Sequence, residues 1–296
     1  RAGTLIHFVN HIAEAVEKNH PGVIIDTLAY QYTRTPPKHI RPRHNVCVRL
    51  CSIECCFFYP LRVDKDILTE DNKESFQKNL EEWSKVSDRL YIWDYVVHFG
   101  HYLLPWPNFR VLADNIRFFI ENHAKGVFEE AAVTEFGGTE FLELRAWVLG
   151  KLLWNPYQDT DALVSEFMTG YYRSAADPIR EYFYLIHEHI AGNPGRHLGI
   201  WQIPPDDYLS REVVERSLAL FDKALVLADD DEILRRVRIA QLPIRYWVLY
   251  KMPPDRPERP ALVDSFFSDL VGLGVHRIRE HMSLQDSRNR LLAGTP

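Results

Sequence analysis

The sequence predicts a mixed α/β fold, in which a parallel sheet of about four strands is followed by an all-helical region. Three observations predict this fold. Short apolar runs alternate with helix-length segments in the first half of the chain, as in βαβ units. Three of these runs carry a carboxylate at or just beyond their ends. The strand pattern then disappears near residue 140, and helical periodicity alone continues.

The expected strands are short runs of apolar, aromatic and β-branched residues, which favour extended structure. They cover residues 23–30, 46–53, 90–95 and 126–129. The expected helices of this half show apolar residues at i, i+3, i+4 and i+7, which is typical of an amphipathic helix. These helices cover residues 4–19, 73–87 and 109–122. This alternation favours parallel pairing of the strands.

Beyond residue 140 only helical stripes remain, separated by proline- and glycine-containing breaks. The predicted helices cover residues 141–154, 161–172, 178–190, 211–227, 232–251 and 260–282. No fixed repeat period relates them, which argues against a solenoid. We therefore expect two domains, one over residues 1–155 and a helical one over residues 156–296.

Bulk properties exclude several classes of function. The net charge is -6 and the pI is near 6.1, so no basic face for nucleic acid is indicated. No run reaches the ~20 apolar residues of a membrane span, and the start of the chain lacks an apolar signal region. Phosphate-binding loops, dinucleotide fingerprints and nucleophile elbows are absent from the sequence. All four cysteines lie within residues 47–56, where we expect free buried thiols.

Three acidic residues lie at or just beyond the ends of the predicted strands and are the candidate catalytic groups. They are Glu54, Asp94 and Glu129. Because the carboxyl ends of parallel strands meet at one edge, these side chains are expected to line one cleft. Paired carboxyl groups are the usual equipment for glycoside hydrolysis, and an N-acetylated sugar can supply its own acetamide in place of one. The alternative is that each acid pairs with an arginine, such as Arg49 or Arg145.

Aromatic residues near the same edge are candidate sugar contacts, since their rings combine apolar area with a polar tip. They are Tyr30, Tyr32, Trp93, His101 and Trp106. Core packing is the alternative, and for Trp93 we favour it. The last two residues belong to a long loop, residues 96–108, and long loops in compact domains are often functional. His98 and His101 lie in this loop, and a loop does not direct two histidine rings to one metal ion as one face of a helix does. Neither a metal nor another cofactor is therefore expected.

Five stretches, residues 25–33, 48–55, 90–95, 102–105 and 115–122, closely resemble the bacterial family filed as domain of unknown function 4838. That family overlaps glycoside hydrolase family 163, the endo-β-N-acetylglucosaminidases that cut complex N-glycans. The resemblance covers roughly residues 2–190. It implies the C-terminal half of a TIM-like (β/α)8 barrel, strands five to eight, distantly similar to α-glucuronidases. One departure is that Glu129 is followed by Glu130 and two alanines, where many relatives have a glycine-containing turn.

The resemblance also carries expectations about function. It implies a glycoside hydrolase with Glu54, Asp94 and Glu129 as catalytic residues, acting on an oligosaccharide or a glycoprotein glycan. The alternatives are a non-catalytic carbohydrate-binding or interaction module and an α-glucuronidase-like enzyme. The family implies a secreted, periplasmic or cell-surface location in bacteria. A half barrel exposes sheet edges, so we expect an N-terminal half or a partner chain to complete it.

Overall fold

The computed structural model describes residues 1–63, 75–131, 138–193, 195 and 197–295. Two compact units emerge from the packing of the chain. Unit 1 comprises residues 1–96 and 111–131, and unit 2 comprises residues 97–110 and 132–296. Because residues 97–110, which follow the third strand, belong to unit 2, the chain passes between the units more than once. The expected domains, residues 1–155 and 156–296, stay a prediction.

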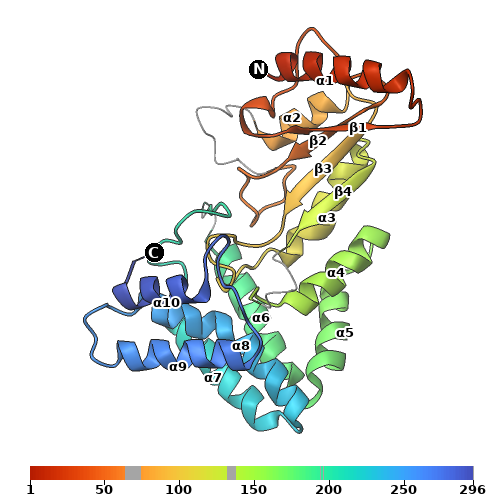
Figure 1. Cartoon of the computed structure of the whole chain (residues 1–296). Helices are drawn as coiled ribbons and strands as arrows, with labels where there is room; N and C mark the ends of the chain where they lie inside the picture. Colours follow the sequence, from red (N-terminus) through yellow and green to blue (C-terminus); the bar gives the residue numbers. More distant parts are fainter. Residues whose placement is uncertain (64–74, 132–137, 194, 196, 296) are drawn as a thin grey trace. The chain divides into compact units, whose positions relative to one another are not determined.

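Unit 1 is built on a four-stranded parallel sheet of order β1-β2-β3-β4, in which every strand pairs with its neighbour in sequence (Figure 1). The strands are β1 (Ile25–Ala29), β2 (Val46–Cys51), β3 (Leu90–Tyr95) and β4 (Gly126–Glu130). The helices are α1 (Ala2–Glu17), α2 (Phe76–Trp83) and α3 (Phe109–Glu121), with a 3-10 turn η1 (Gln31–Thr33) after β1. This confirms the predicted α/β class, its parallel strands and the helical region after them. The sequential strand order is consistent with part of a barrel.

The two faces of the sheet differ in burial because successive side chains alternate. One face is covered, and its residues Val48, Leu50 and Ile92 are buried completely. On the opposite face Tyr91 and Phe128 remain 38% and 45% exposed. We call these the covered face and the open face. The distinction decides where each acidic residue at the end of the sheet points.

Helix α1 packs against the sheet with its apolar stripe, which includes Ile6, Val9 and Ala13. The side chain of Asn45, just before β2, donates a 3.0 Å hydrogen bond to the carbonyl of Ala13. Ser75 is the N-cap of helix α2, and its hydroxyl accepts from the backbone N–H of Lys78. Residues 73 and 74 of the helix predicted there lie outside the described residues.

The four cysteines of unit 1 are buried thiols that form no disulfide, as predicted. Burial raises the pKa of Cys47 to about 11 and that of Cys51 to about 12. Negative charges at Asp26 and Glu54 add to these shifts. Both thiols are therefore protonated at neutral pH and are weak nucleophiles.

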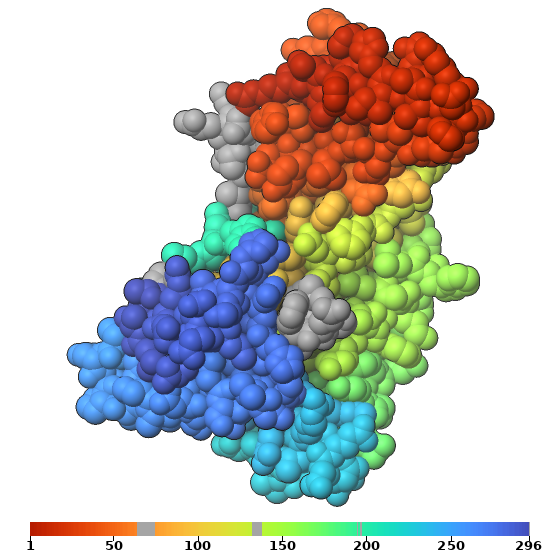
Figure 2. All heavy atoms as spheres, in the orientation of Figure 1, coloured from red at the N-terminus to blue at the C-terminus, as the bar shows by residue number. Residues whose placement is uncertain are grey.

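Unit 2 is helical over its described residues, and Figure 1 shows its helices in green to blue. They are α4 (Leu142–Trp154), α5 (Thr160–Tyr172), α6 (Ala176–Ala191), α7 (Arg211–Leu227), α8 (Asp231–Lys251), α9 (Arg259–Gly272) and α10 (Leu284–Ala293). Side-chain N-caps begin four of them, at Asp159, Ser210, Asp230 and Ser283. The last three helices share a core around Phe266, and the blue surface in Figure 2 belongs to this part of the chain.

One predicted helix of unit 2 is wrong. The stripe at residues 260–282 predicted a continuous helix, but α9 ends at Gly272 and an irregular segment, residues 273–283, separates it from α10. Gly274 has φ +84°, and the N–H of Val275 returns to the carbonyl of Leu270. A glycine in this left-handed conformation is a common way to end a helix.

Among the described residues, none of the helices combines the length and the apolar character that crossing a bilayer requires.

Candidate functional site

The register of the sheet places Ser52, Asp94 and Glu129 in one row at its carboxyl edge. Asp94 lies directly opposite Glu129 in the β3–β4 pair. Cys51 pairs with Trp93, so the next residue, Ser52, lies opposite Asp94, and its N–H donates to the carbonyl of Trp93. Since these are alternate positions to Leu50 and Ile92 along their strands, the row belongs to the covered face.

The carboxylate of Asp94 is buried and surrounded by donors. The residue is 1% exposed. Ser52 Oγ donates to Asp94 Oδ1 at 2.5 Å, and the backbone N–H of Tyr95 donates to the same carboxylate. The carboxyl groups of Asp94 and Glu129 are also hydrogen-bonded to each other. Two carboxyl groups can share such a bond only when one of them holds a proton.

Burial and proximity decide which of the two carboxyl groups is protonated. Burial raises the pKa of Asp94 from 3.8 to about 6, against the hydrogen bonds from Ser52 and Tyr95, which lower it. Burial raises the pKa of Glu129 well above its usual value, and the charge of Asp94 raises it further. Because its donors stabilise the charged form of Asp94, the proton stays on Glu129 at neutral pH.

Glu129 also has an unfilled hydrogen-bonding position. Its Oε2 atom is buried and has no partner among the described residues. The residue as a whole is only half-buried, because β4 is an edge strand of the sheet. A buried polar atom without a partner is uncommon in folded proteins and often marks a functional position.

Glu130 is a candidate that the sequence interpretation missed. It lies opposite Tyr95, and by alternation it points to the open face. Its Oε2 accepts a 2.6 Å hydrogen bond from Trp93 Nε1. Arg49, on the same face, lies 5.8 Å from the Trp93 ring centroid and forms a 2.8 Å ion pair with Asp26. The adjacent acids Glu129 and Glu130 were the available signal, because neighbouring strand residues point to opposite faces.

Glu54 does not join the acid pair. It follows β2 and forms a 3.2 Å ion pair with Arg34, whose side chain is completely buried. Burial is the main cause that raises the pKa values of Cys51 and Tyr95. The negative charges of Glu54 and Glu130 raise the pKa values of these two side chains further. These two side chains alternate with Ser52 and Asp94 and belong to the open face. The structure thus brings Asp94 and Glu129 together and leaves Glu54 with a different set of neighbours.

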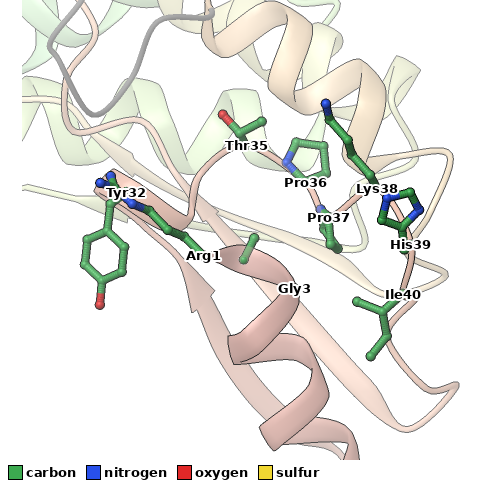
Figure 3. A pocket seen from close by; sticks show the side chains of 10 residues that line it. Arg1, Gly3, Tyr32, Thr35, Pro36, Pro37, Lys38, His39 and Ile40 are labelled. Carbon is green, nitrogen blue, oxygen red and sulfur yellow. The ribbon is translucent and has the colours of Figure 1, made fainter.

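The predicted aromatic contacts of unit 1 have different surroundings. Tyr30 is half-buried before η1, and its hydroxyl accepts from Gln31 Nε2 at 3.2 Å. Tyr32 is 56% exposed and lines a surface pocket of about 590 Å³ between the start of α1 and residues 35–40 (Figure 3). Trp93 is half-buried and forms an edge contact with Phe128, at 4.8 Å between ring centroids.

His101 and Trp106 belong to unit 2 and are buried there, at 4% and 1% exposure. His101 Nδ1 lies 2.6 Å from the hydroxyl of Tyr246. The backbone N–H of Trp106 donates to Glu140 Oε2 at 2.9 Å. Their role as sugar contacts stays a prediction.

No cluster of three or more histidine, cysteine, aspartate or glutamate side chains suited to a metal ion occurs among the residues that the structure describes. The row Ser52, Asp94 and Glu129 offers hydroxyl and carboxyl chemistry, with one acidic proton and one carboxylate. This arrangement is equipped for proton transfer.

The comparisons with known proteins give one family match, which covers more than half of the chain. A family model described as domain of unknown function (DUF4838) matches residues 1–184. Searches of curated proteins and of solved structures give no match. The matched residues include the whole parallel sheet and the acid pair at its carboxyl edge.

Proposed function

The chain belongs to the DUF4838 family, and from this premise we propose that the protein is a glycoside hydrolase acting on complex glycans, with an activity like that of an endo-β-N-acetylglucosaminidase. The observation that carries the proposal is the hydrogen-bonded acid pair Asp94 and Glu129 at the carboxyl edge of the parallel sheet. Catalytic groups of barrel enzymes occupy this edge.

The spacing of the pair favours one mechanism. Retaining glycosidases that use a protein nucleophile hold their carboxyl groups ~5–5.5 Å apart, and inverting enzymes hold them further apart. Asp94 and Glu129 are directly opposite each other on paired strands, and each carboxyl group alters the pKa of the other. They suit hydrolysis in which the substrate's own acetamide oxygen attacks the anomeric carbon. This is the reason for proposing an N-acetylated sugar at the cleaved bond.

In the proposed reaction Glu129 is the general acid. Its proton passes to the leaving glycosidic oxygen while the acetamide oxygen forms a bond to the anomeric carbon and the glycosidic bond breaks. Water then attacks the anomeric carbon of the resulting oxazolinium ion, the bond from that carbon to the acetamide oxygen breaks, and Glu129 takes up the proton from that water. Asp94 stays ionised and stabilises the positive charge that develops. Ser52 positions Asp94 through its short hydrogen bond.

Glu54, which follows the neighbouring strand β2, is the third acidic residue that we propose for the catalytic site. The proposed sugar contacts are those that the sequence indicated. They are Tyr30, Tyr32, Trp93, His101 and Trp106.

The test uses the natural full-length protein, incubated with a panel of N-glycoproteins and, separately, with xylans that carry uronic acids. Products are identified by mass. Release of a glycan that ends in one N-acetylglucosamine supports the proposal. A uronic acid product would indicate an α-glucuronidase-like enzyme instead, and the absence of any product would favour a non-catalytic carbohydrate-binding or interaction module.

The matched variants are Glu129→Gln and Glu121→Gln. Loss of the general acid should lower kcat about 10²-fold or more. Glu121 is an exposed glutamate at the end of α3, and its replacement should leave kcat within about twofold of the parent protein. Equal activity of the two variants would overturn the role of Glu129.

A further inference from the structure

Arg279 of unit 2 is a buried cation without a carboxylate partner among the described residues. It lies in the segment between α9 and α10 and is 7% exposed. Its Nη2 donates to the hydroxyl of Tyr246 at 3.2 Å, which is a neutral acceptor. Burying a guanidinium is costly unless an anion or several hydrogen bonds compensate its charge.

The other buried arginines of the described residues are compensated in one of these two ways. Arg34 pairs with Glu54 at 3.2 Å, and Arg145 lies 3.7 Å from Glu140. Arg259 donates to the carbonyls of Leu249, Met252 and Leu291, at the ends of α8 and α10. Arg279 has neither arrangement.

Three groups near Arg279, the rings of His98 and His101 and the hydroxyl of Tyr246, are neutral. His98 donates from Nε2 to the carbonyl of Gln202 at 2.9 Å, because its Nδ1 accepts the backbone N–H of His101. Since Tyr246 accepts from Arg279, its hydroxyl proton points to His101 Nδ1 at 2.6 Å. Burial lowers the pKa of His98 to about 4 and that of His101 to about 2, so both rings are neutral.

The backbone holds Arg279 in a fixed position. The residues on either side of it are bonded to the loop that follows β3. Tyr102 N–H donates to the carbonyl of Ile278 at 2.9 Å, and Glu280 N–H donates to the carbonyl of Phe99 at 3.0 Å. A cation fixed in this way is preorganised, so binding an anion costs little ordering.

Aromatic surface lies beside the cation. The rings of Tyr246 and Tyr250 are stacked, with centroids 6.0 Å apart and an interplanar angle of 29°. Tyr250 is half-buried, so part of the residue is accessible. A planar guanidinium recognises a carboxylate through paired hydrogen bonds, and an aromatic ring next to it offers a surface for the apolar face of a sugar.

We propose that Arg279, with Tyr246 and Tyr250, forms a binding site for the carboxylate of an acidic monosaccharide unit. The carboxylate accepts from the guanidinium, and the sugar ring packs against Tyr250. Glucuronate and N-acetylneuraminate share this chemistry and are the two sources to distinguish. The site lies entirely within unit 2 and does not depend on hydrolysis at the acid pair.

The experiment is isothermal titration of the whole protein with glucuronate, N-acetylneuraminate, glucose and inorganic phosphate, each at the same ionic strength. Saturable binding of at least one acidic sugar, at least tenfold tighter than glucose and phosphate, is expected. The acidic sugar that binds more tightly identifies which of the two monosaccharides the site recognises. Equal binding of glucose or phosphate, or no saturable binding of either acidic sugar, would overturn the proposal.

The variant Arg279→Gln should weaken the binding of the acidic sugar at least tenfold. Arg279→Lys keeps the charge without the planar fork and should weaken it several-fold, which keeps the test decisive if the glutamine variant fails to fold. The control is Arg277→Gln, two residues away and half-buried, with unchanged affinity expected. A folded Arg279 variant that binds like the parent protein would rule the site out.

Discussion

Ser52 Oγ lies 2.5 Å from Asp94 Oδ1, so a side chain just after β2 stabilises the carboxylate of β3. The hydrogen bond lowers the pKa of Asp94, which burial raises to about 6. Ser52→Ala removes it and should destabilise the fold by about 2 kcal/mol, the usual range for a hydrogen bond to a charged group. Chemical denaturation measures this loss.

The same variant should also move the pKa of Asp94 upward. If Asp94 must be ionised for turnover, the acidic limb of the rate profile lies near pH 6 in the parent protein and at higher pH in Ser52→Ala. The control is Ser84→Ala, which removes a half-buried hydrogen bond to the carbonyl of Glu81 and should leave the limb in place. An acidic limb that does not move would exclude the proposed role of Ser52.

Glu54 is expected to contribute to stability through Arg34. The Arg34 side chain is completely buried, so Glu54→Gln removes an ion pair that its charge makes at 3.2 Å. Removing one partner of a buried ion pair typically costs ~3–5 kcal/mol, and partial exposure of Glu54 places the expected loss near the lower end. The free energy of unfolding from urea titration measures it.

The comparison for Glu54 is Glu121→Gln, which breaks an exposed ion pair with Arg62. Exposed pairs are worth under ~1 kcal/mol, so this control should be close to the parent protein. If Glu54→Gln were as stable as the control and yet inactive, Glu54 would be catalytic in its own right.

The strands could be predicted from the sequence because each is a short apolar run with clear boundaries. Residues 90–95 predict β3 at its observed bounds, and the expected strands at 46–53 and 126–129 differ from β2 and β4 by two residues or fewer at each end. Helix α9 was predicted too long because the apolar stripe continues past Gly272. Only the positive φ of Gly274 reveals the break, and a stripe carries no information about φ.

The candidate site was predictable in part. Strand ends indicate that Asp94 and Glu129 lie at one edge, but the face of each side chain depends on the register of neighbouring strands. Ser52 entered the site only through that register, since an isolated serine after a strand has no sequence signal. The separation of Glu54 from the pair follows from its contact with Arg34, which is 20 residues away in the chain.

Gly138 packs against the backbone of the segment that holds Arg279. A Cβ atom at this position would lie 1.7 Å from the carbonyl oxygen of Arg277. Gly138→Ala must therefore displace backbone, and we expect a loss of at least about 3 kcal/mol in the free energy of unfolding. The matched control is Gly150→Ala in α4, where an added Cβ would have no atom within 4 Å beyond the adjacent residues and the backbone of its own helix.

The control substitution should have the opposite sign, because alanine is favoured over glycine inside a helix by ~1 kcal/mol. Thermal denaturation of the two variants distinguishes them directly. A melting temperature for Gly138→Ala equal to that of the parent protein would contradict the close approach of residues 138 and 277.

Glu140 should make the stability of the protein depend on pH. It is 4% exposed, and burial raises its pKa from 4.5 to about 7, against the opposing effects of Arg145 and the N–H of Trp106. A carboxyl group with a raised pKa binds its proton more tightly in the folded state. Its contribution to stability is therefore complete below about pH 4.5 and is lost as the pH rises through 7.

The expected size of this effect is about 3 kcal/mol, from a shift of about 2.5 pH units at ~1.36 kcal/mol each. The free energy of unfolding of the parent protein, minus that of Glu140→Gln, should fall by this amount between pH 4 and pH 8. Leu152→Ala in α4 removes a buried side chain without a titratable group. It should lower stability by a constant amount at every pH. A difference curve for Glu140→Gln that is as flat as this control would show that the pKa of Glu140 is the same in the folded and the unfolded protein, despite its burial.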